Sequence, residues 1–252
     1  MKRITVTIAV MAAVLLLAVG LTGCINVNLG GLGSIIGNGV METREVTISS
    51  ALTGVRNMGS FDVLMDPSLK GKAELSGEQN ILDQIDARQD ASGVFIISWK
   101  NGISISTSRG VQVRMPVISG GTVEMSGSGS IRLASGAVLE SSRLDLRLNG
   151  SGDIELAVSA SDITANINGS GDIRASGSTK GLKVSINGSG SFDGFDLASS
   201  TVEVSIFGSG DANVDVSQSL TGSVNGSGDV TYSGSPATVN VGGMGSGEVH
   251  KR

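Results

Sequence analysis

The sequence is poor in the residues on which many folds and active sites depend. Its 252 residues include one Cys, one His, one Trp and three Pro, and aromatic residues make up 3%. A single Cys excludes a disulfide-stabilised scaffold and a zinc site built from several thiolates of one chain. A net charge of −5 gives no basic surface for nucleic acid or anionic lipid.

Glycine is the exception, with 38 residues. This is about twice the average usage but well below the one-third that collagen requires. The hydrophobic content of 39% is also too high for a disordered low-complexity chain. The chain is therefore expected to fold and to use glycine in some regular way.

The first residues are typical of an export signal. Residues 1–23 begin with two basic residues and continue as a run of apolar and small residues over 4–20. The run ends in Leu21-Thr22-Gly23-Cys24, which resembles a bacterial lipobox and predicts that Cys24 is lipidated. The alternative is an uncleaved transmembrane anchor, since about 17 apolar residues is the lower limit for crossing a bilayer. Both interpretations tether the protein to a membrane from outside the cytoplasm.

Two less regular regions follow the signal. Residues 24–43 are rich in Gly and Asn and predict a tether between the lipid and the folded domain. Residues 44–118 carry strand patterns and predict an irregular cap on the same domain, which would protect the open end of a repeat structure. Within them, Ile81, Leu82 and Ile85 indicate a short helix over 78–88. Trp99 is expected in this cap, with a sugar-stacking platform as the alternative.

A repeat accounts for much of the glycine. The tripeptide Gly-Ser-Gly occurs seven times over 119–252, at steps of 18 to 23 residues, and the consensus around it is Asn-Gly-Ser-Gly-Asp-Ile. Two glycines around a Ser allow a positive φ or a close backbone approach, so each motif predicts a sharp corner. The corner glycines are Gly127, Gly129, Gly150, Gly152, Gly169, Gly171, Gly188, Gly190, Gly208, Gly210, Gly226, Gly228, Gly245 and Gly247.

Apolar residues alternate with polar ones before each corner, which indicates strands with one buried face. We therefore predict an all-β fold, a single-stranded parallel β-helix (β-solenoid) with coils of about 19 residues. Equivalent positions should stack into rows, and one such row is Leu144, Ile163, Leu182, Val202, Leu220 and Val239. An antiparallel β-sandwich is the alternative, but it fits a nearly constant step less well.

Aspartate follows four of the corners, at Asp153, Asp172, Asp211 and Asp229. Asp ladders in Gly-rich nonapeptide repeats bind calcium, so these residues form a candidate metal site. The period here is about twice as long, and Ser interrupts the row. The preferred interpretation is a solubilising charge, and no cofactor is expected.

The chain resembles a known family through an ordered set of short motifs. These are Arg44-Glu-Val, Phe61-Asp-Val-Leu, Asn80-Ile-Leu, Gly102-Ile-Ser-Ile, Val113-Arg-Met-Pro and the repeated Asn-Gly-Ser-Gly-Asp-Ile. In this order they are similar to the auto-transporter adhesin head GIN domain, over residues 44–232. The resemblance implies a right-handed β-helix on a secreted or surface-anchored bacterial protein, and it brings no catalytic residue.

Three functions stay open. The first is adhesin-like binding of a glycan or protein ligand along the rigid polar face of the β-helix, with the lipid anchor on a bacterial membrane and the domain facing the periplasm or the exterior. The second is a structural envelope lipoprotein without a specific ligand. An enzyme acting on polysaccharides is disfavoured, because the only His is His250, near the end of the chain.

The lipobox makes a direct prediction. Metabolic labelling with a fatty acid should mark the full-length chain, because its acyl acceptor is the Cys24 thiol, and Cys24→Ala should abolish the label. Cys24→Ser is a control of closer size. An unlabelled wild-type chain would exclude the lipid anchor.

Overall fold

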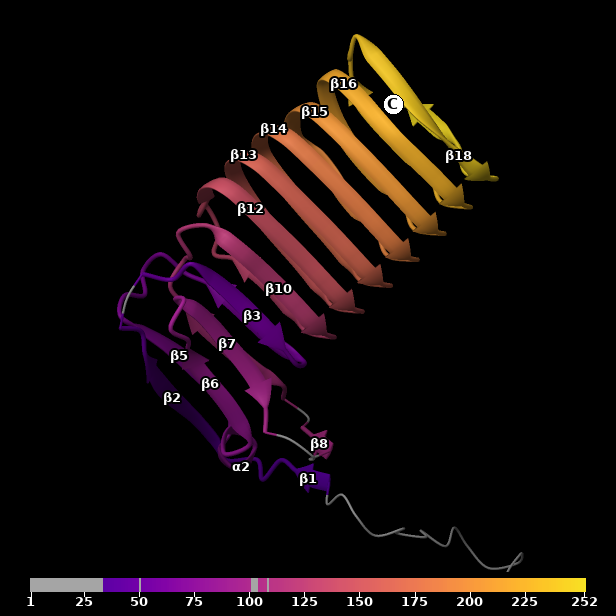
Figure 1. Ribbon diagram of the computed structural model, residues 1–252. Helices are drawn as coiled ribbons and strands as arrows, with labels where there is room; N and C mark the ends of the chain where they lie inside the picture. Colours follow the sequence, from indigo (N-terminus) through magenta and orange to yellow (C-terminus); the bar gives the residue numbers. More distant parts are fainter. Residues whose placement is uncertain (1–33, 50, 101–103, 108) are drawn as a thin grey trace, which may run out of the picture. The chain divides into compact units, whose positions relative to one another are not determined.

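The long strands of the chain are the successive coils of a solenoid (Figure 1). The computed structural model describes residues 34–49, 51–100, 104–107 and 109–252, and Ser34–Arg252 form one compact unit. The signal segment 1–23, the lipidation candidate Cys24 and residues 25–33 of the predicted tether lie outside the described residues. The rest of the predicted tether, residues 34–43, is part of the folded unit, because it contains a short strand, Ser34–Ile36, and the start of another, Met41–Thr47.

Parallel pairing in register defines the repeat region. In coils such as Asp153–Gly169, a single strand bends near its middle and ends at a Gly-Ser-Gly corner. For example, Leu144 pairs with Ile163 and Ile163 with Leu182. This pairing excludes the antiparallel sandwich and confirms the β-solenoid. Its strands are β10 (Gly121–Gly127), β11 (Ser130–Leu133), β12 (Leu139–Gly150), β13 (Asp153–Gly169), β14 (Asp172–Gly188), β15 (Phe192–Gly208), β16 (Ala212–Gly226), β17 (Val230–Gly234), β18 (Thr238–Gly245) and β19 (Val249–Lys251).

The core is a stack of aliphatic rows inside the coils. The predicted row runs in register from Leu144 through Leu220, and all of its residues up to that point are buried. Val239 continues the row but is 42% exposed. The row is thus in register throughout but is only partly buried at its last member, because no described strand lies over Val239.

Backbone approach between coils explains the glycines of the corners. The first glycine of each motif has a φ between 129° and 151°, a region that other residues rarely adopt. The second has no such φ, but its position is equally confined: a Cβ on Gly190 would lie 2.2 Å from the Gly171 carbonyl oxygen. Amides of one corner donate to carbonyls of the previous one, as in Ser170 N to Gly150 O at 2.9 Å. The stacked corners thus leave no room for a side chain at either of their two glycines.

Two further coils lie in the front section. One is built from β3 (Gly54–Met58) and β4 (Phe61–Met65), and the other from β7 (Val94–Trp99) and β9 (Val111–Met115). The pair β3 and β4 stacks between β7 and β9 on one side and β10 and β11 on the other. The spatial order of these coils therefore differs from their order in the sequence.

The corner of the β3–β4 coil is a reduced form of the motif. Gly59-Ser60 turns the chain, and Phe61 stands where the other corners have their second glycine. The Asn57 side chain supports this turn by donating from Nδ2 to the Phe61 carbonyl at 2.8 Å. The solenoid therefore begins earlier than its first Gly-Ser-Gly motif.

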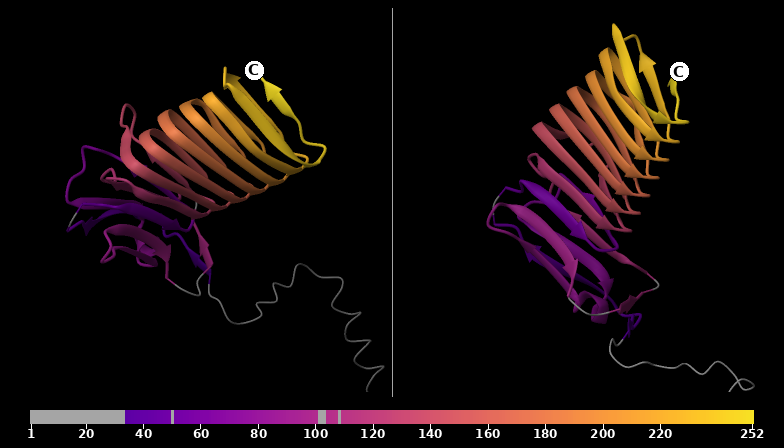
Figure 2. Two further views of the ribbon diagram at one scale, coloured as in Figure 1. Left: turned by 45° about the horizontal axis from the view of Figure 1, so that its top comes forward. Right: turned by 45° about the vertical axis from the view of Figure 1, so that its right-hand side comes forward.

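Antiparallel strands cover the front end of the solenoid (Figure 2). β5 (Lys72–Glu78) pairs with β9 and with β2 (Met41–Thr47), while β6 (Ile85–Gln89) pairs with β7. A short parallel pair, β1 (Ser34–Ile36) and β8 (Ser104–Ser106), lies beside them.

The helix expected over 78–88 is wrong in extent. Only the single turn α2 (Gln79–Leu82) is helical, and β6 begins at Ile85. Ile81 and Leu82 are buried, and Ile85 pairs with Trp99 across the antiparallel strands. Pairing of this segment with β7 thus outweighs a weak helical pattern, because it also satisfies the backbone groups at the edge of the front coil.

The corners give a stability prediction. Gly190→Ala should lower the free energy of unfolding by about 3 kcal/mol, because the new methyl group overlaps backbone that cannot move independently. Gly242→Ala is the matched control, since a Cβ there has no atom within 4 Å. Urea unfolding followed by far-UV circular dichroism measures both. Equal midpoints for the two variants would contradict this account of the corner.

Candidate functional site

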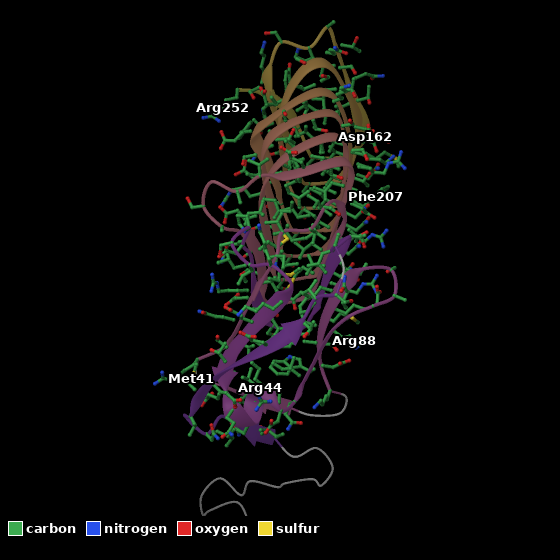
Figure 3. All side chains as sticks on the ribbon, turned by 90° about the vertical axis from the view of Figure 1, so that its left-hand side faces the viewer. Met41, Arg44, Arg88, Asp162, Phe207 and Arg252 are labelled. Atoms are coloured by element: carbon green, nitrogen blue, oxygen red, sulfur yellow. The ribbon has the colours of Figure 1, made fainter. Side chains whose placement is uncertain are left out.

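One side of the solenoid carries a regular grid of outward-pointing side chains. They come from the strand segments just before the corners, and parallel register places equivalent positions about 4.8 Å apart. Figure 3 labels two of them, Asp162 and Phe207, on the same side of the ribbon. We call this surface the polar face. Its four rows are Arg143, Asp162, Gly181, Thr201, Ser219, Thr238; Asp145, Thr164, Lys183, Glu203, Thr221, Asn240; Arg147, Asn166, Ser185, Ser205, Ser223, Gly242; and Asn149, Asn168, Asn187, Phe207, Asn225, Met244.

Charges on the polar face cancel. Three basic residues stand against three acidic ones, and Lys183 Nζ lies 2.7 Å from Glu203 Oε1. Arg147 pairs with Asp145, and that hydrogen bond raises the pKa of the guanidinium further above its ordinary value. The face therefore presents hydroxyl and amide groups with little net field, which does not favour a polyanion.

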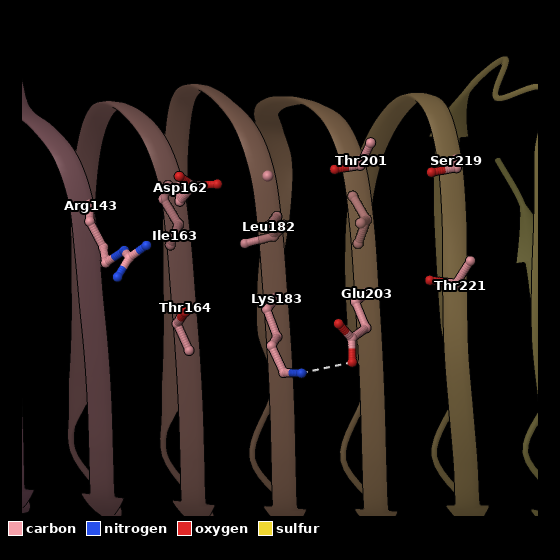
Figure 4. Close-up of a pocket in the computed structure, with 12 residues that line it drawn as sticks. Arg143, Asp162, Ile163, Thr164, Leu182, Lys183, Thr201, Glu203, Ser219 and Thr221 are labelled. Carbon is pink, nitrogen blue, oxygen red and sulfur yellow. Dashed lines mark hydrogen bonds and ion pairs between the residues drawn. The ribbon is translucent and has the colours of Figure 1, made fainter.

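A shallow hollow lies in the polar face around Gly181. Its volume is about 500 Å³, and Figure 4 shows the side chains around it. Gly181 stands in the row between Asp162 and Thr201, and the Asp162 carboxylate leans over it, since a Cβ on Gly181 would lie 2.8 Å from Asp162 Oδ1. The rim carries Arg143, Asp162, Lys183 and hydroxyl groups from Thr164, Thr201 and Thr221. Such a rim offers many hydrogen bonds but little apolar area.

An asparagine ladder runs along the corner edge of this face. Asn168 Nδ2 donates to Asn149 Oδ1 at 3.0 Å, and Asn187 Nδ2 donates to Asn168 Oδ1 at 3.1 Å. The ladder stops at the next coil, where Phe207 replaces Asn and is 53% exposed. An aromatic ring thus stands at a position where four of the seven corners have an amide.

The amides on both sides of Phe207 have unused hydrogen-bonding groups. Among the described residues, Asn187 Oδ1 accepts no hydrogen bond and Asn225 Nδ2 donates none, although Asn225 Oδ1 accepts from the Met244 amide at 3.2 Å. Both are in register with Phe207, Asn187 on the coil before it and Asn225 on the coil after it. The ring is therefore flanked by a free acceptor and a free donor.

The acidic residues after the corners bind backbone amides. Asp172 Oδ1 accepts from the Ser191 amide at 2.9 Å, and Asp211 Oδ1 accepts from the Asp229 amide at 2.8 Å. Asp229 does the same for Glu248, and Asp153 lies in register with Asp172. In the described ranges no group of three or more His, Cys, Asp or Glu is placed to hold a metal ion. The geometry assigns the carboxylates of Asp172, Asp211 and Asp229 to joining coils.

Trp99 lies in the front section, away from the polar face. Its ring packs against that of Phe61, with centroids 4.4 Å apart and planes at 42°. Phe61 is fully buried and Trp99 partly so. This places Trp99 at the edge of the core, as expected for a residue of the covered end.

Phe207 and Gly181 were not identified from the sequence. Each departs from the repeat, Phe207 by replacing the Asn of the corner and Gly181 by leaving a gap in an outward row. A comparison of the coils position by position would have found both. A search for motifs instead finds positions where the same residue recurs, so it does not detect residues that depart from the repeat.

These features define the class of protein: a parallel β-solenoid with a flat, neutral, polar face that bears an exposed aromatic ring. The sequence assigns it more closely. Residues 51–236 match the family described as "Putative auto-transporter adhesin, head GIN domain", and the chain belongs to this family. That membership supports an adhesin-like function and a location outside the cytoplasm.

Solved structures share the fold. A protein described as a putative adhesin from Bacteroides fragilis NCTC 9343 has a TM-score of 0.78 at 18% identity, covering 87% of this chain and 100% of its own. A putative lipid binding protein from Parabacteroides distasonis ATCC 8503 has a TM-score of 0.68 at 23% identity, and the match covers 87% of this chain and 100% of its own. A putative adhesin from Parabacteroides merdae ATCC 43184 has a TM-score of 0.65 at 18% identity, and the match covers 87% of this chain and 99% of its own.

Comparison with curated protein sequences gives no significant match. The family and the similar structures are described as adhesins or a lipid binding protein rather than as enzymes. In the part of the chain that the structure describes, no helix is long and apolar enough to cross a membrane.

The role of the acidic residues can be tested at Asp211. Asp211→Ala should lower the free energy of unfolding by about 1 kcal/mol, because the Asp229 amide loses its acceptor, while Asp211→Asn keeps an oxygen there. Differential scanning calorimetry of the two variants measures this. Added calcium should leave the melting temperature of the wild type unchanged. A rise with calcium that Asp211→Asn removes would instead establish a metal site.

Proposed function

We propose that this chain is an exported bacterial envelope protein, tethered by a lipid on Cys24, that binds neutral glycans through its polar face in an adhesin-like manner. The observation that supports this proposal most directly is Phe207, an exposed aromatic ring between two amides with free hydrogen-bonding groups. Family membership supports adhesion in general, and the polar face supports the type of ligand.

A sugar ring matches this arrangement chemically. One face of a pyranose presents C–H groups that can lie on an aromatic ring, while its hydroxyl groups both donate and accept hydrogen bonds. Asn187 Oδ1 and Asn225 Nδ2 supply one acceptor and one donor beside Phe207. The same carbohydrate chain could extend over the hydroxyl groups that surround the hollow at Gly181.

A protein ligand is less well matched to the polar face. Stable protein interfaces bury about 800 Å² on each partner around an apolar core. Among the polar-face residues, only Phe207 and Met244 are exposed large apolar side chains, and they lie two coils apart. The balanced charges of the polar face likewise give no electrostatic steering of a charged partner toward it.

Binding to an array of neutral and uronate-containing oligosaccharides tests the proposal, with the full-length chain in detergent micelles. Phe207→Asn restores the residue that other corners carry, so it should fold normally and weaken binding to neutral oligosaccharides about tenfold. Phe195→Ala is the matched control, because Phe195 lies on the first half of β15 and contacts Arg252 instead.

Three results would contradict the proposal. Equal affinity of Phe207→Asn and the wild type would remove the ring from the site. A preference for uronate-containing chains would contradict the neutral face. No binding to any oligosaccharide would favour the structural envelope role.

A further inference from the structure

The last coil of the solenoid is open. Among the described strands, β18 pairs only with β16, and β19 only with β17. The outer edges of β18 and β19 therefore leave backbone groups without a strand partner, at the end of the unit marked C in Figure 1. Unpaired edges of this kind are ready to accept another strand.

Apolar side chains line the same opening. Val239 and Val249 are 42% and 38% exposed, whereas the residues in register one coil earlier, Leu220 and Val230, are fully buried. The two valines therefore occupy core positions without a layer above them. Another coil placed on this end would bury them just as the earlier residues are buried.

The opposite end is protected in two ways. Both strands of its outermost coil, β7 and β9, are covered by antiparallel strands, β6 and β5. The outermost strands there are also charged, with Glu42, Arg44 and Glu45 in β2 and Asp86 and Arg88 in β6. Charged edge strands resist pairing. The covered coil and the charged edges of β2 and β6 thus disfavour head-to-tail stacking of copies and favour contact between two open ends.

The open edge is compatible with itself. β18 reads Thr-Val-Asn-Val-Gly-Gly-Met-Gly and has no charge, so two copies can pair antiparallel without opposing like charges. Around β19, an antiparallel pair centred on His250 would place Glu248 of one copy opposite Arg252 of the other. Contacts between two identical surfaces close into a two-fold dimer and do not propagate.

We propose that two copies of this chain join end to end through the open coil, with β18 of one copy pairing antiparallel with β18 of the other. The contact covers the exposed valines and satisfies the free strand edges. It uses the outer backbone edge of β18, while the outward side chains of β18, which are the last members of the polar-face rows, stay on the side of the solenoid.

Sedimentation equilibrium of the full-length chain in detergent tests the dimer. We expect a dimer at micromolar concentration, and Val239→Lys should raise its dissociation constant at least tenfold. Thr164→Lys is the matched control, since it adds the same charge to an outward row four coils away. Circular dichroism confirms the fold of both. A monomeric wild type, or a dimer that Val239→Lys leaves unchanged, would overturn the proposal.

Single cysteines along the edge test the arrangement. Cysteines are placed one at a time at Thr238, Asn240, Gly242 and Met244 in the full-length chain. In an antiparallel pair, disulfide-linked dimers should peak at one position and decline away from it, because only residues near the two-fold axis meet their own copy. The unsubstituted chain controls for Cys24. Uniform cross-linking, or none, would exclude this pairing.

Discussion

At the Gly-Ser-Gly corners successive coils stack backbone on backbone, and the rest of the unit depends on that contact. Carbonyl oxygens of one corner occupy the space where the next corner would place a Cβ, so the position tolerates glycine alone. Amides of each corner donate to the corner before it, which fixes the coils in register. Register then aligns Ile, Leu and Val into continuous inner rows, and a narrow interior filled in this way needs few aromatic residues. Glycine and scarce aromatics are therefore two consequences of one geometry.

Because the coils are in register, a residue that differs from its equivalents in the other coils changes the surface at one place only. Where the repeat is kept, side chains satisfy one another along the stack, as in the amide ladder from Asn149 to Asn187. Where it is broken, groups become available: Phe207 ends the ladder and leaves its neighbours with free hydrogen-bonding groups, and Gly181 opens a hollow. A solenoid thus separates stability from binding. The inner rows and corners maintain the scaffold, while outward positions can change without disturbing it.

The sequence predicted the repeat part of the fold more fully than the ends. Period, parallel stacking and the inner row from Leu144 to Leu220 all follow from spacing, because each coil meets only its neighbours. The β3–β4 coil was not predicted, since its corner retains Gly59 and Ser60 but has Phe61 in place of the second glycine. Its position between β7 and β10 also reflects long-range pairing, which no local pattern encodes. The same pairing turned part of the expected helix into β6. Of the site residues, Phe207 departs from the consensus that guided the search, and Cys24 stays a prediction.

The two ends of the unit differ in a way that bears on adhesion. A solenoid of stacked parallel strands necessarily has two free edges, and each must be covered, charged or paired. Here the front end is covered by antiparallel strands whose own edges carry charge, whereas no described strand covers the last coil and its β18 has no charge. The described part of the chain begins with β1 beside this covered end, so the tether proposed above would leave the open coil available for contact. Pairing of two open coils would orient two tethered copies in opposite directions, with their polar faces still exposed along the sides. One fold would then combine attachment between copies with binding of other ligands, because the end and the side of a solenoid are separate surfaces.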